Sequence, residues 1–175
     1  FLMEEGGEIS GKDPARRWII DPIDGTTNFI HGIPYFAISI ALQEYDQITA
    51  GVIYEPINDQ MFWAEKGNGA WLNDRRMRVS GRTNMEQSIF ATGIPFVGRG
   101  DHKKFLEQIE AVMAVSAGIR RFGSAALDLA YVAAGRFDGF WENGLQPWDI
   151  AAGIIIVREA GGMVSEINGR DAMLK

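Results

Sequence analysis

The sequence contains no cysteine and only two histidines. The absence of cysteine excludes disulfide bonds, thiolate zinc sites and cysteine nucleophiles. No uninterrupted apolar run approaches the length of a membrane-spanning helix, so we expect no membrane association. Basic residues are also scarce, because 17 lysines and arginines face 23 aspartates and glutamates and leave a formal net charge of −6. This acidic balance argues against direct binding of nucleic acid, but suits a carboxylate site that a metal ion would neutralise.

Length and composition indicate a globular chain. Its 175 residues are 46% hydrophobic, which suits one compact unit or a part of a larger one. The first residue is phenylalanine, and the chain opens inside an apolar and acidic segment. We therefore expect that an N-terminal segment precedes it. The lack of cysteine favours a cytoplasmic location.

The stretch from Trp18 to Phe29, with the sequence WIIDPIDGTTNF, is the most informative part of the chain. Its apolar start, Trp18 to Ile20, predicts a buried strand that ends abruptly at two aspartates, Asp21 and Asp24. Two carboxylates so close together at the end of a buried strand repel each other and lose hydration, and a divalent cation would compensate both. We therefore expect a metal site here.

The residues that follow these aspartates favour a phosphate site. Gly25 allows a tight turn and a close approach of the backbone to a ligand. The amides of Thr26 and Thr27 can open a short helical turn, whose free N–H groups attract phosphate. The stretch thus predicts a site that holds Mg²⁺ and phosphate together.

The first half of the chain has the pattern of an antiparallel meander. Short runs rich in apolar and β-branched residues alternate with turn residues, a spacing typical of strands joined by tight connections. A polar loop over 6–17 comes before them. The expected strands are 35–42, 48–55, 60–65, 70–72, 77–79 and 87–92.

The second half alternates strands with helices, which predicts a layered α/β sheet. Helices are expected at 102–117, capped by Asp101, at about 125–134, capped by Ser124, and at 148–160, started by Pro147. Strands are expected at 119–122, 137–142 and 163–167. The irregular stretch 93–100 marks the best boundary, so we expect an antiparallel metal-binding half, 1–95, and an α/β half, 96–175, that carries the second metal and substrate motif.

Asp149 is a second candidate ligand, in the first turn of the last expected helix. Aspartate is favoured there by the helix dipole alone, so its position does not require a ligand. The rest of this helix, Trp148 and 150–157, is apolar almost all round, which predicts that it is buried. A buried helix that presents one carboxylate at its N-terminal end can place that carboxylate in a cleft.

Three separated segments resemble the inositol monophosphatase family, and within it the bacterial extragenic-suppressor type. They are Glu4-Glu5, the stretch 18–29, and PWDIAAG at 147–153 followed by EAGG at 159–162. The resemblance covers essentially the whole chain. It implies an α/β (α+β) fold, a layered αβαβα sandwich of the sugar phosphatase type, of which this chain would lack the N-terminal helices.

The resemblance also implies Mg²⁺-dependent, lithium-sensitive hydrolysis of a phosphate monoester with two or three Mg²⁺ ions. Glu4, Asp21 and the carbonyl of Ile23 would hold one ion. Asp21 would bridge to a second ion, which Asp24 and Asp149 would also hold. A third ion would be bound by Glu4 and water molecules. These oxygen ligands are the type that Mg²⁺ prefers, and a pair of metals suits an in-line displacement by water.

Catalytic and substrate roles follow from the same resemblance. Glu4 and Thr26 would be catalytic, with Thr26 orienting the attacking water, and the amides of Gly25 and Thr26 would hold the phosphate. In the family, a further aspartate ahead of the first acidic pair assists the threonine, and this chain starts after that point. The substrate ring would contact Gly123, Ser124, Ala125 and Glu142. Without the resemblance, Ser124 is a plain N-cap and Glu142 a strand-end surface charge.

Inositol-1-phosphate is the leading substrate, and a homodimer is the expected assembly. Fructose-1,6-bisphosphate, 3′-phosphoadenosine-5′-phosphate and histidinol phosphate are the rival substrates, although Thr27-Asn28-Phe29 favours the inositol type over the nucleotide type. A role of a different class is contact with the transcription machinery, because some bacterial relatives act in antitermination. His31 and His102 have no ligand partner at a suitable spacing, so we expect them on the surface.

Overall fold

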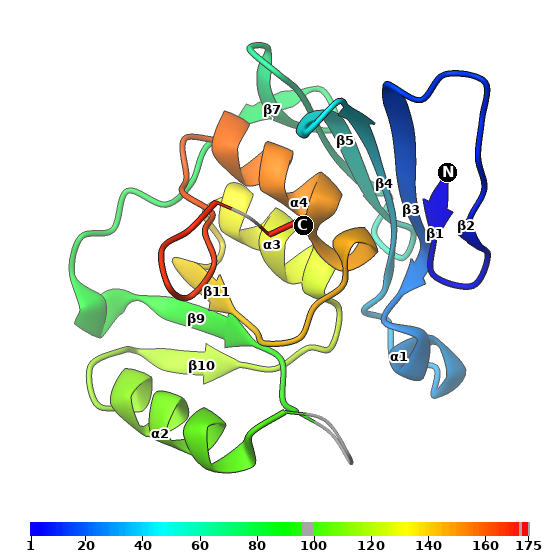
Figure 1. Ribbon diagram of the computed structural model, residues 1–175. Helices are drawn as coiled ribbons and strands as arrows, with labels where there is room; N and C mark the ends of the chain where they lie inside the picture. Colours follow the sequence, from blue (N-terminus) through cyan, green and yellow to red (C-terminus); the bar gives the residue numbers. More distant parts are fainter. Residues whose placement is uncertain (96–99, 172, 175) are drawn as a thin grey trace.

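The computed structural model describes residues 1–95, 100–171, 173 and 174. The chain forms an eight-stranded sheet in the order β2-β1-β3-β4-β5-β6-β7-β8 and a three-stranded sheet in the order β10-β9-β11 (Figure 1). The strands are β1 Leu2–Met3, β2 Gly7–Glu8, β3 Arg16–Asp24, β4 Ala37–Glu44, β5 Gln47–Glu55, β6 Gln60–Glu65, β7 Gly69–Leu72, β8 Arg75–Met77, β9 Ile89–Thr92, β10 Gly118–Arg120 and β11 Gly139–Trp141. The helices are α1 Thr26–Ile30, η1 Met85–Gln87, α2 His102–Met113, α3 Ala125–Ala133 and α4 Pro147–Glu159.

The elements stack in layers. Helices α3 and α4 pack on one face of the large sheet, and α3 also contacts the small sheet, whose strand β10 contacts α2 (Figure 1). The sequence of layers is therefore sheet, helices, sheet, helix. This confirms the predicted layered α/β sandwich, here without a helical layer on the outer face of the large sheet in the described part of the chain.

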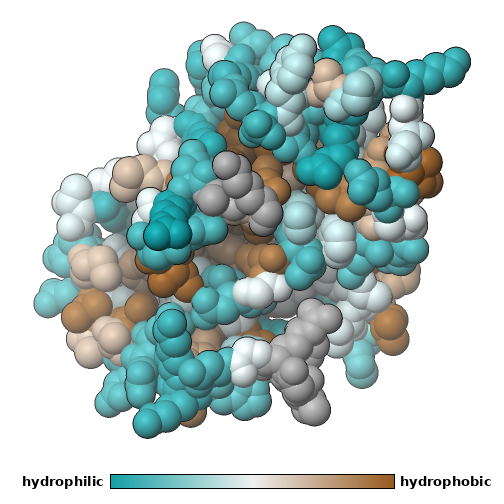
Figure 2. Space-filling view, in the orientation of Figure 1, coloured by the Kyte–Doolittle hydropathy of each residue, from teal (hydrophilic) through white to brown (hydrophobic). Residues whose placement is uncertain are grey.

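The predicted antiparallel meander is confirmed for β3 to β8, in which each strand pairs with the next. Its alternation gives the large sheet two different faces. On β4, Ala37, Ser39 and Ala41 are buried, and the Ser39 hydroxyl lies 3.3 Å from the Trp148 carbonyl of α4. The residues between them point the other way, and Ile38 is 38% exposed. Figure 2 shows that the face of the molecule turned to the viewer is largely hydrophilic, with apolar patches between.

Helix α4 is the centre of the core, as its apolar sequence predicts. All its residues from Ala151 to Val157 are buried. Glycines let it approach its neighbours closely on two sides. A Cβ on Gly51 of β5 would lie 2.7 Å from the Ile155 side chain, and a Cβ on Gly153 would lie 2.4 Å from Leu129 of α3. Helix α4 is thus pressed between the large sheet and α3, which fixes the position of its N-terminal end.

Several details differ from the sequence-based expectations. The expected strand 87–92 begins only at Ile89, as β9, and it pairs in parallel with β10 and β11 in the small sheet instead of extending the meander. The expected strand 77–79 lies at Arg75–Met77, as β8. The segment 163–167 is not a strand, and Met163 is 97% exposed, because apolar residues alone do not make a strand without a neighbouring strand to bond. Helix α2 ends at Met113, before the expected 117. The loop 6–17 contains the short strand β2. In addition, no helix of the described residues is both long and apolar enough to cross a membrane. The division at 95/96 stays a prediction.

Candidate metal centre

An irregularity in β3 brings Asp21 and Asp24 to the same side of the large sheet. Side chains alternate along a regular strand, so residues three apart would point to opposite faces. Here the register against β4 shifts between them, because Asp21 pairs with Ser39 whereas Asp24 pairs with Ala37. The extra residue on β3 restores the match. Both aspartates are therefore buried on the side that faces α4, at 1% and 8% exposure.

Asp149 completes the cluster from a distant part of the chain. It lies in the first turn of α4, where one of its oxygens, Oδ2, accepts a hydrogen bond of 2.7 Å from the Gln146 amide. One carboxylate oxygen from each of Asp21, Asp24 and Asp149 lies within 4.8 Å of the others. The helix-capping role and the ligand role predicted for Asp149 are thus compatible in this arrangement.

Helix α3 fixes the orientation of Asp24. The Ser124 hydroxyl donates to Asp24 Oδ2 at 2.5 Å, and the Ala126 amide donates to the same oxygen at 2.7 Å. Ser124 is also the N-cap of α3, as predicted, because its oxygen accepts from the Leu127 amide. The sequence could not reveal the bonds to Asp24, because they join residues about a hundred positions apart.

The electrostatics of the cluster favour a bound cation. Burial, and then repulsion by Asp24 and Glu4, raises the pKa of Asp21 to about 8. Burial likewise raises the pKa of Asp24 to about 7, although its hydrogen bonds from Ser124 and Ala126 act in the opposite direction. Such a set of converging carboxylate oxygens fits a divalent metal, and oxygen is the ligand type that Mg²⁺ prefers. The metal-binding character predicted from the sequence is therefore supported by the geometry.

Glu4, Ile23 and Thr26 border this cluster. Glu4 follows β1, whose Met3 pairs with Ile20 in parallel, so Glu4 and Asp21 are the next residues along the two strands. Its carboxylate is exposed and is not part of the tight three-aspartate group. The Ile23 amide donates to Asp21 Oδ1 at 2.9 Å, and its carbonyl accepts from the Thr26 hydroxyl at 3.0 Å. The turn after Asp21 is thus held by the side chains of Asp21 and Thr26, which both hydrogen-bond to the Ile23 backbone.

Gly25 sits where no other residue fits easily. Its φ is +94°, and an added Cβ would lie 3.1 Å from the Tyr35 carbonyl and 3.2 Å from the Gly123 carbonyl. Gly123 itself has a φ of +89°. The two glycines face each other beside Asp24, where the start of α1 meets the start of α3. The structure thus brings the predicted phosphate turn and the predicted Gly123-Ser124-Ala125 loop together.

Glu142 lies beyond the end of β11, near the aspartates. Burial, and then repulsion by Asp24 and Asp149, raises its pKa to about 7, while Arg121 acts to lower it. Its carboxylate packs against Gly93 so closely that a Cβ there would overlap it. Glu142 and Asp149 both line a cavity of about 190 Å³. Glu142 is therefore a half-buried acid beside the cluster and not a plain surface charge.

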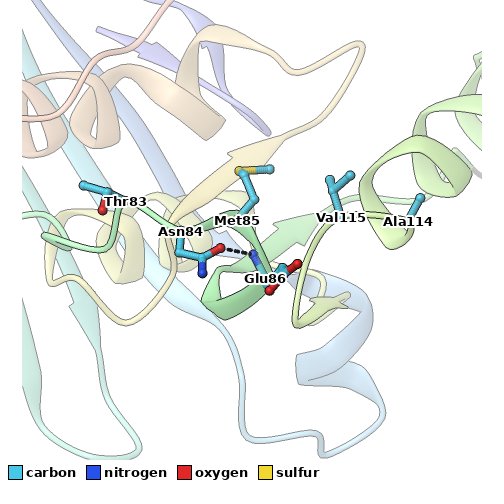
Figure 3. Close-up of a pocket in the computed structure, with 6 residues that line it drawn as sticks. All are labelled: Thr83, Asn84, Met85, Glu86, Ala114 and Val115. Carbon is cyan, nitrogen blue, oxygen red and sulfur yellow. Dashed lines mark hydrogen bonds between the residues drawn. The ribbon is translucent and has the colours of Figure 1, made fainter.

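A further hollow lies away from this acidic centre. It has a volume of about 610 Å³ and is lined by Thr83, Asn84, Met85, Glu86, Ala114 and Val115. In Figure 3, the Asn84 side chain is bonded to the Glu86 amide, which makes it part of a local turn. This hollow contains none of the clustered aspartates. His31 and His102 are both exposed, as predicted.

Comparisons with known proteins show what the chain is similar to. A sequence profile of the inositol monophosphatase family matches residues 1–175. An inositol-1-monophosphatase from Mesorhizobium japonicum is 58% identical over 174 residues, 99% of this chain and 65% of that protein. The Nus factor SuhB of Pseudomonas aeruginosa is 48% identical over 179 residues, 100% of this chain and 66% of that protein.

A solved structure extends the comparison to the fold. The extragenic suppressor protein SuhB from Bartonella henselae is similar to this chain with a TM-score of 0.95 and 59% sequence identity, over 98% of this chain and 66% of that one. The chain therefore spans about 65% of the length of the first relative. The fold, the family profile and the sequence identities lead to one conclusion: the chain belongs to the inositol monophosphatase family.

Proposed function

We propose that this chain carries the metal and substrate site of a Mg²⁺-dependent phosphate monoester hydrolase. The observation that supports the proposal best is the cluster of Asp21, Asp24 and Asp149, whose carboxylate oxygens converge and in which the buried Asp21 and Asp24 have raised pKa values. Mg²⁺ bound there, as two or three ions, would neutralise the substrate phosphate and lower the pKa of the water that attacks it. Phosphoryl transfer needs mainly such positioning and charge neutralisation.

The proposal assigns a task to each neighbouring residue. Asp21, Asp24, Asp149, Glu4 and the Ile23 carbonyl would hold the metal. The Thr26 hydroxyl would turn from the Ile23 carbonyl toward the attacking water and accept its hydrogen bond, and the amides of Gly25 and Thr26 would bind phosphate oxygens. The substrate hydroxyls would lie toward Gly123, Ala125 and the Glu142 carboxylate. Ser124 would act mainly on Asp24, because its buried hydroxyl already donates there.

We propose inositol-1-phosphate as the substrate, which would be cleaved to inositol and phosphate. The relative from Mesorhizobium japonicum carries the name inositol-1-monophosphatase. The Glu142 carboxylate, an acceptor for hydroxyl groups, also suits a polyol better than a second phosphate. We expect lithium to inhibit the reaction, and we expect a cytoplasmic location.

Phosphate release from a panel of esters tests this proposal. The panel contains inositol-1-phosphate, fructose-1,6-bisphosphate, 3′-phosphoadenosine-5′-phosphate and histidinol phosphate, each with and without Mg²⁺. We expect Mg²⁺-dependent release, fastest from inositol-1-phosphate, that Asp21→Asn and Asp149→Asn abolish. The exposed Asp74→Asn is the matched control and should retain activity. Absence of release from every ester in the presence of Mg²⁺, by a protein that includes the expected N-terminal segment, would refute the proposal.

A second candidate function is contact with the transcription machinery. The 48% identical relative from Pseudomonas aeruginosa is named Nus factor SuhB, which favours this role. A pull-down with transcription complexes would test it. Stoichiometric binding that survives Asp21→Asn would show that the contact does not need the metal centre, whereas no binding by the unchanged protein would rule out this role.

A homodimer is the assembly that we propose. Helix α1 and the loop after it expose apolar side chains, because Phe29, Ile30 and Ile33 are 50%, 74% and 47% exposed. Light scattering after size-exclusion chromatography would measure the mass. We expect twice the mass of the chain and a shift toward the monomer in Ile30→Asp. A monomeric unchanged protein would contradict this expectation.

A further inference from the structure

A single buried amide joins the two segments that shape the metal centre. Asn28 lies in α1 and is only 4% exposed. Its Nδ2 atom donates to the Tyr35 carbonyl and to the Phe122 carbonyl, both at 2.7 Å. A side-chain amide has two N–H donors, and Asn28 has two backbone acceptors in different segments. One acceptor follows α1, and the other precedes α3.

These contacts form a closed ring with Asp24. Asn28 stands four residues after Asp24, and Phe122 comes just before Gly123 and Ser124. The Ser124 hydroxyl and the Ala126 amide then return to Asp24 Oδ2. The same two segments are thus fastened at two points, by Asn28 at one end and by Asp24 at the other. Two points of attachment fix the orientation of one segment against the other, which a single contact cannot do.

The space around this ring leaves little freedom. A Cβ on Gly123 would lie 3.3 Å from the Asn28 amide nitrogen, and a Cβ on Gly25 would lie 3.2 Å from the Gly123 carbonyl. The backbones can meet this closely only because both residues are glycine. A small shift of the Phe122–Ser124 segment would therefore move the hydroxyl that orients Asp24.

A second contact supports the same joint. The Tyr35 ring stacks on the Phe122 ring with centroids 4.7 Å apart, and its hydroxyl donates to Asp128 Oδ1 at 2.8 Å. Asp128 is buried in the first turn of α3. Asn28 binds the backbone carbonyl of Tyr35, and the Tyr35 hydroxyl binds Asp128 of α3. Tyr35 therefore links Asn28 to the helix whose N-terminal end holds Asp24.

We propose that Asn28 is a positioning residue of the metal centre, which holds Ser124 and the start of α3 in place for Asp24. The proposal rests on the proposed function, because it assumes that Asp24 is a metal ligand. It assigns to Asn28 an effect on metal affinity in addition to any effect on folding. Partners that hydrogen-bond to a metal ligand typically contribute roughly 10–100-fold to metal affinity. We expect about tenfold for Asn28, because it acts through Ser124.

Metal binding by calorimetry, with Mg²⁺ and with Mn²⁺, tests the proposal without any need for activity. The variants are Asn28→Ala and, as a matched control, Asn73→Ala. Asn73 also hydrogen-bonds two backbone groups with its side chain, because it accepts from the Met61 amide at 2.8 Å and donates to the Asp59 carbonyl at 3.2 Å. It lies in the turn between β7 and β8 and is not part of the cluster of Asp21, Asp24 and Asp149. We expect both variants to melt at a lower temperature, and only Asn28→Ala to bind metal about tenfold more weakly.

A double-mutant cycle shows whether Asn28 acts through Ser124. Asn28→Ala and Ser124→Ala should not be additive in metal affinity, because the first already displaces the hydroxyl that the second removes. If Asn28→Ala does not fold, Asn28→Ser, which keeps one donor, takes its place in the same cycle. The role of Asn28 would be overturned if folded Asn28→Ala, or Asn28→Ser in its place, bound metal as tightly as the unchanged protein. Full additivity of the two substitutions would overturn it as well. If the unchanged protein binds no metal, the proposed function itself is wrong.

Discussion

Neutralising Asp21 should make the metal-free protein more stable while it destroys the metal centre. Three carboxylate oxygens lie within 4.8 Å of one another, and burial with this repulsion raises the pKa of Asp21 to about 8. Two unit charges at such a separation repel by about 3 kcal/mol at an effective dielectric constant of about 20. Asparagine removes this repulsion, and it keeps the Oδ1 acceptor that the Ile23 amide uses.

The effect should depend on pH with a defined sign. The pKa of Asp21 is about 8 in the folded chain, against an ordinary value of 3.8. Between these values the folded chain binds more protons than the unfolded chain, so its stability falls as pH rises. We therefore expect the stability advantage of Asp21→Asn over the unchanged protein in EDTA to be about 3 kcal/mol larger at pH 8 than at pH 5.

Thermal unfolding at pH 5 and pH 8, in EDTA and in Mg²⁺, measures these differences. A change of about 3 kcal/mol corresponds to roughly 6–12 °C in the melting temperature of a chain of this size. Mg²⁺ should stabilise the unchanged protein at pH 8 and leave Asp21→Asn unaffected. The exposed Asp74→Asn should behave as the unchanged protein does in all four conditions. A melting temperature of Asp21→Asn below that of the unchanged protein, at pH 8 in EDTA, would refute this reasoning.

Three further predictions concern the site and the packing around it. Because protons compete with metal at the aspartates, Mg²⁺ affinity measured by calorimetry should rise from pH 6 to pH 8, and a flat profile would contradict the raised pKa values of Asp21 and Asp24. Gly25→Ala should cost about 1–3 kcal/mol in urea unfolding and weaken inorganic phosphate binding, because its φ is +94° and the new Cβ would lie 3.1 Å from the Tyr35 carbonyl. Gly51→Ala should cost about 1–3 kcal/mol by overpacking against α4, and it should also weaken Mg²⁺ binding in calorimetry, because this packing sets the position of the α4 end that carries Asp149; unchanged affinity would show that other contacts hold that end.

The sequence predicts the local elements well where turn residues and alternation agree. The meander from β3 to β8 and the buried helix α4 are examples, because each can be recognised from neighbouring residues. It fails at 163–167, where apolar residues suggest a strand but the backbone has no partner strand. Pairing is a property of the whole sheet, so a short segment cannot reveal it.

The same limit applies to the site. The spacing of Asp21 and Asp24 indicates a carboxylate pair, but a regular strand would place them on opposite faces. Only the register shift against β4 explains how both face α4. The bonds from Ser124 and Ala126 to Asp24, and from Asn28 to Phe122, join residues far apart in the sequence. Propensity and spacing carry no information about such contacts, so the three-dimensional structure is needed to find them.

The origin of the aspartates in distant segments has a consequence for the order of folding. Asp149 reaches Asp21 and Asp24 only after α4 has packed on the large sheet, and contacts of such long sequence separation are slow to form. Metal affinity therefore exists only in the nearly complete fold. We expect Mg²⁺ to slow unfolding and to leave the rate of folding almost unchanged. In this view the ion does not guide the chain to its structure, but lengthens the lifetime of the structure once it has formed.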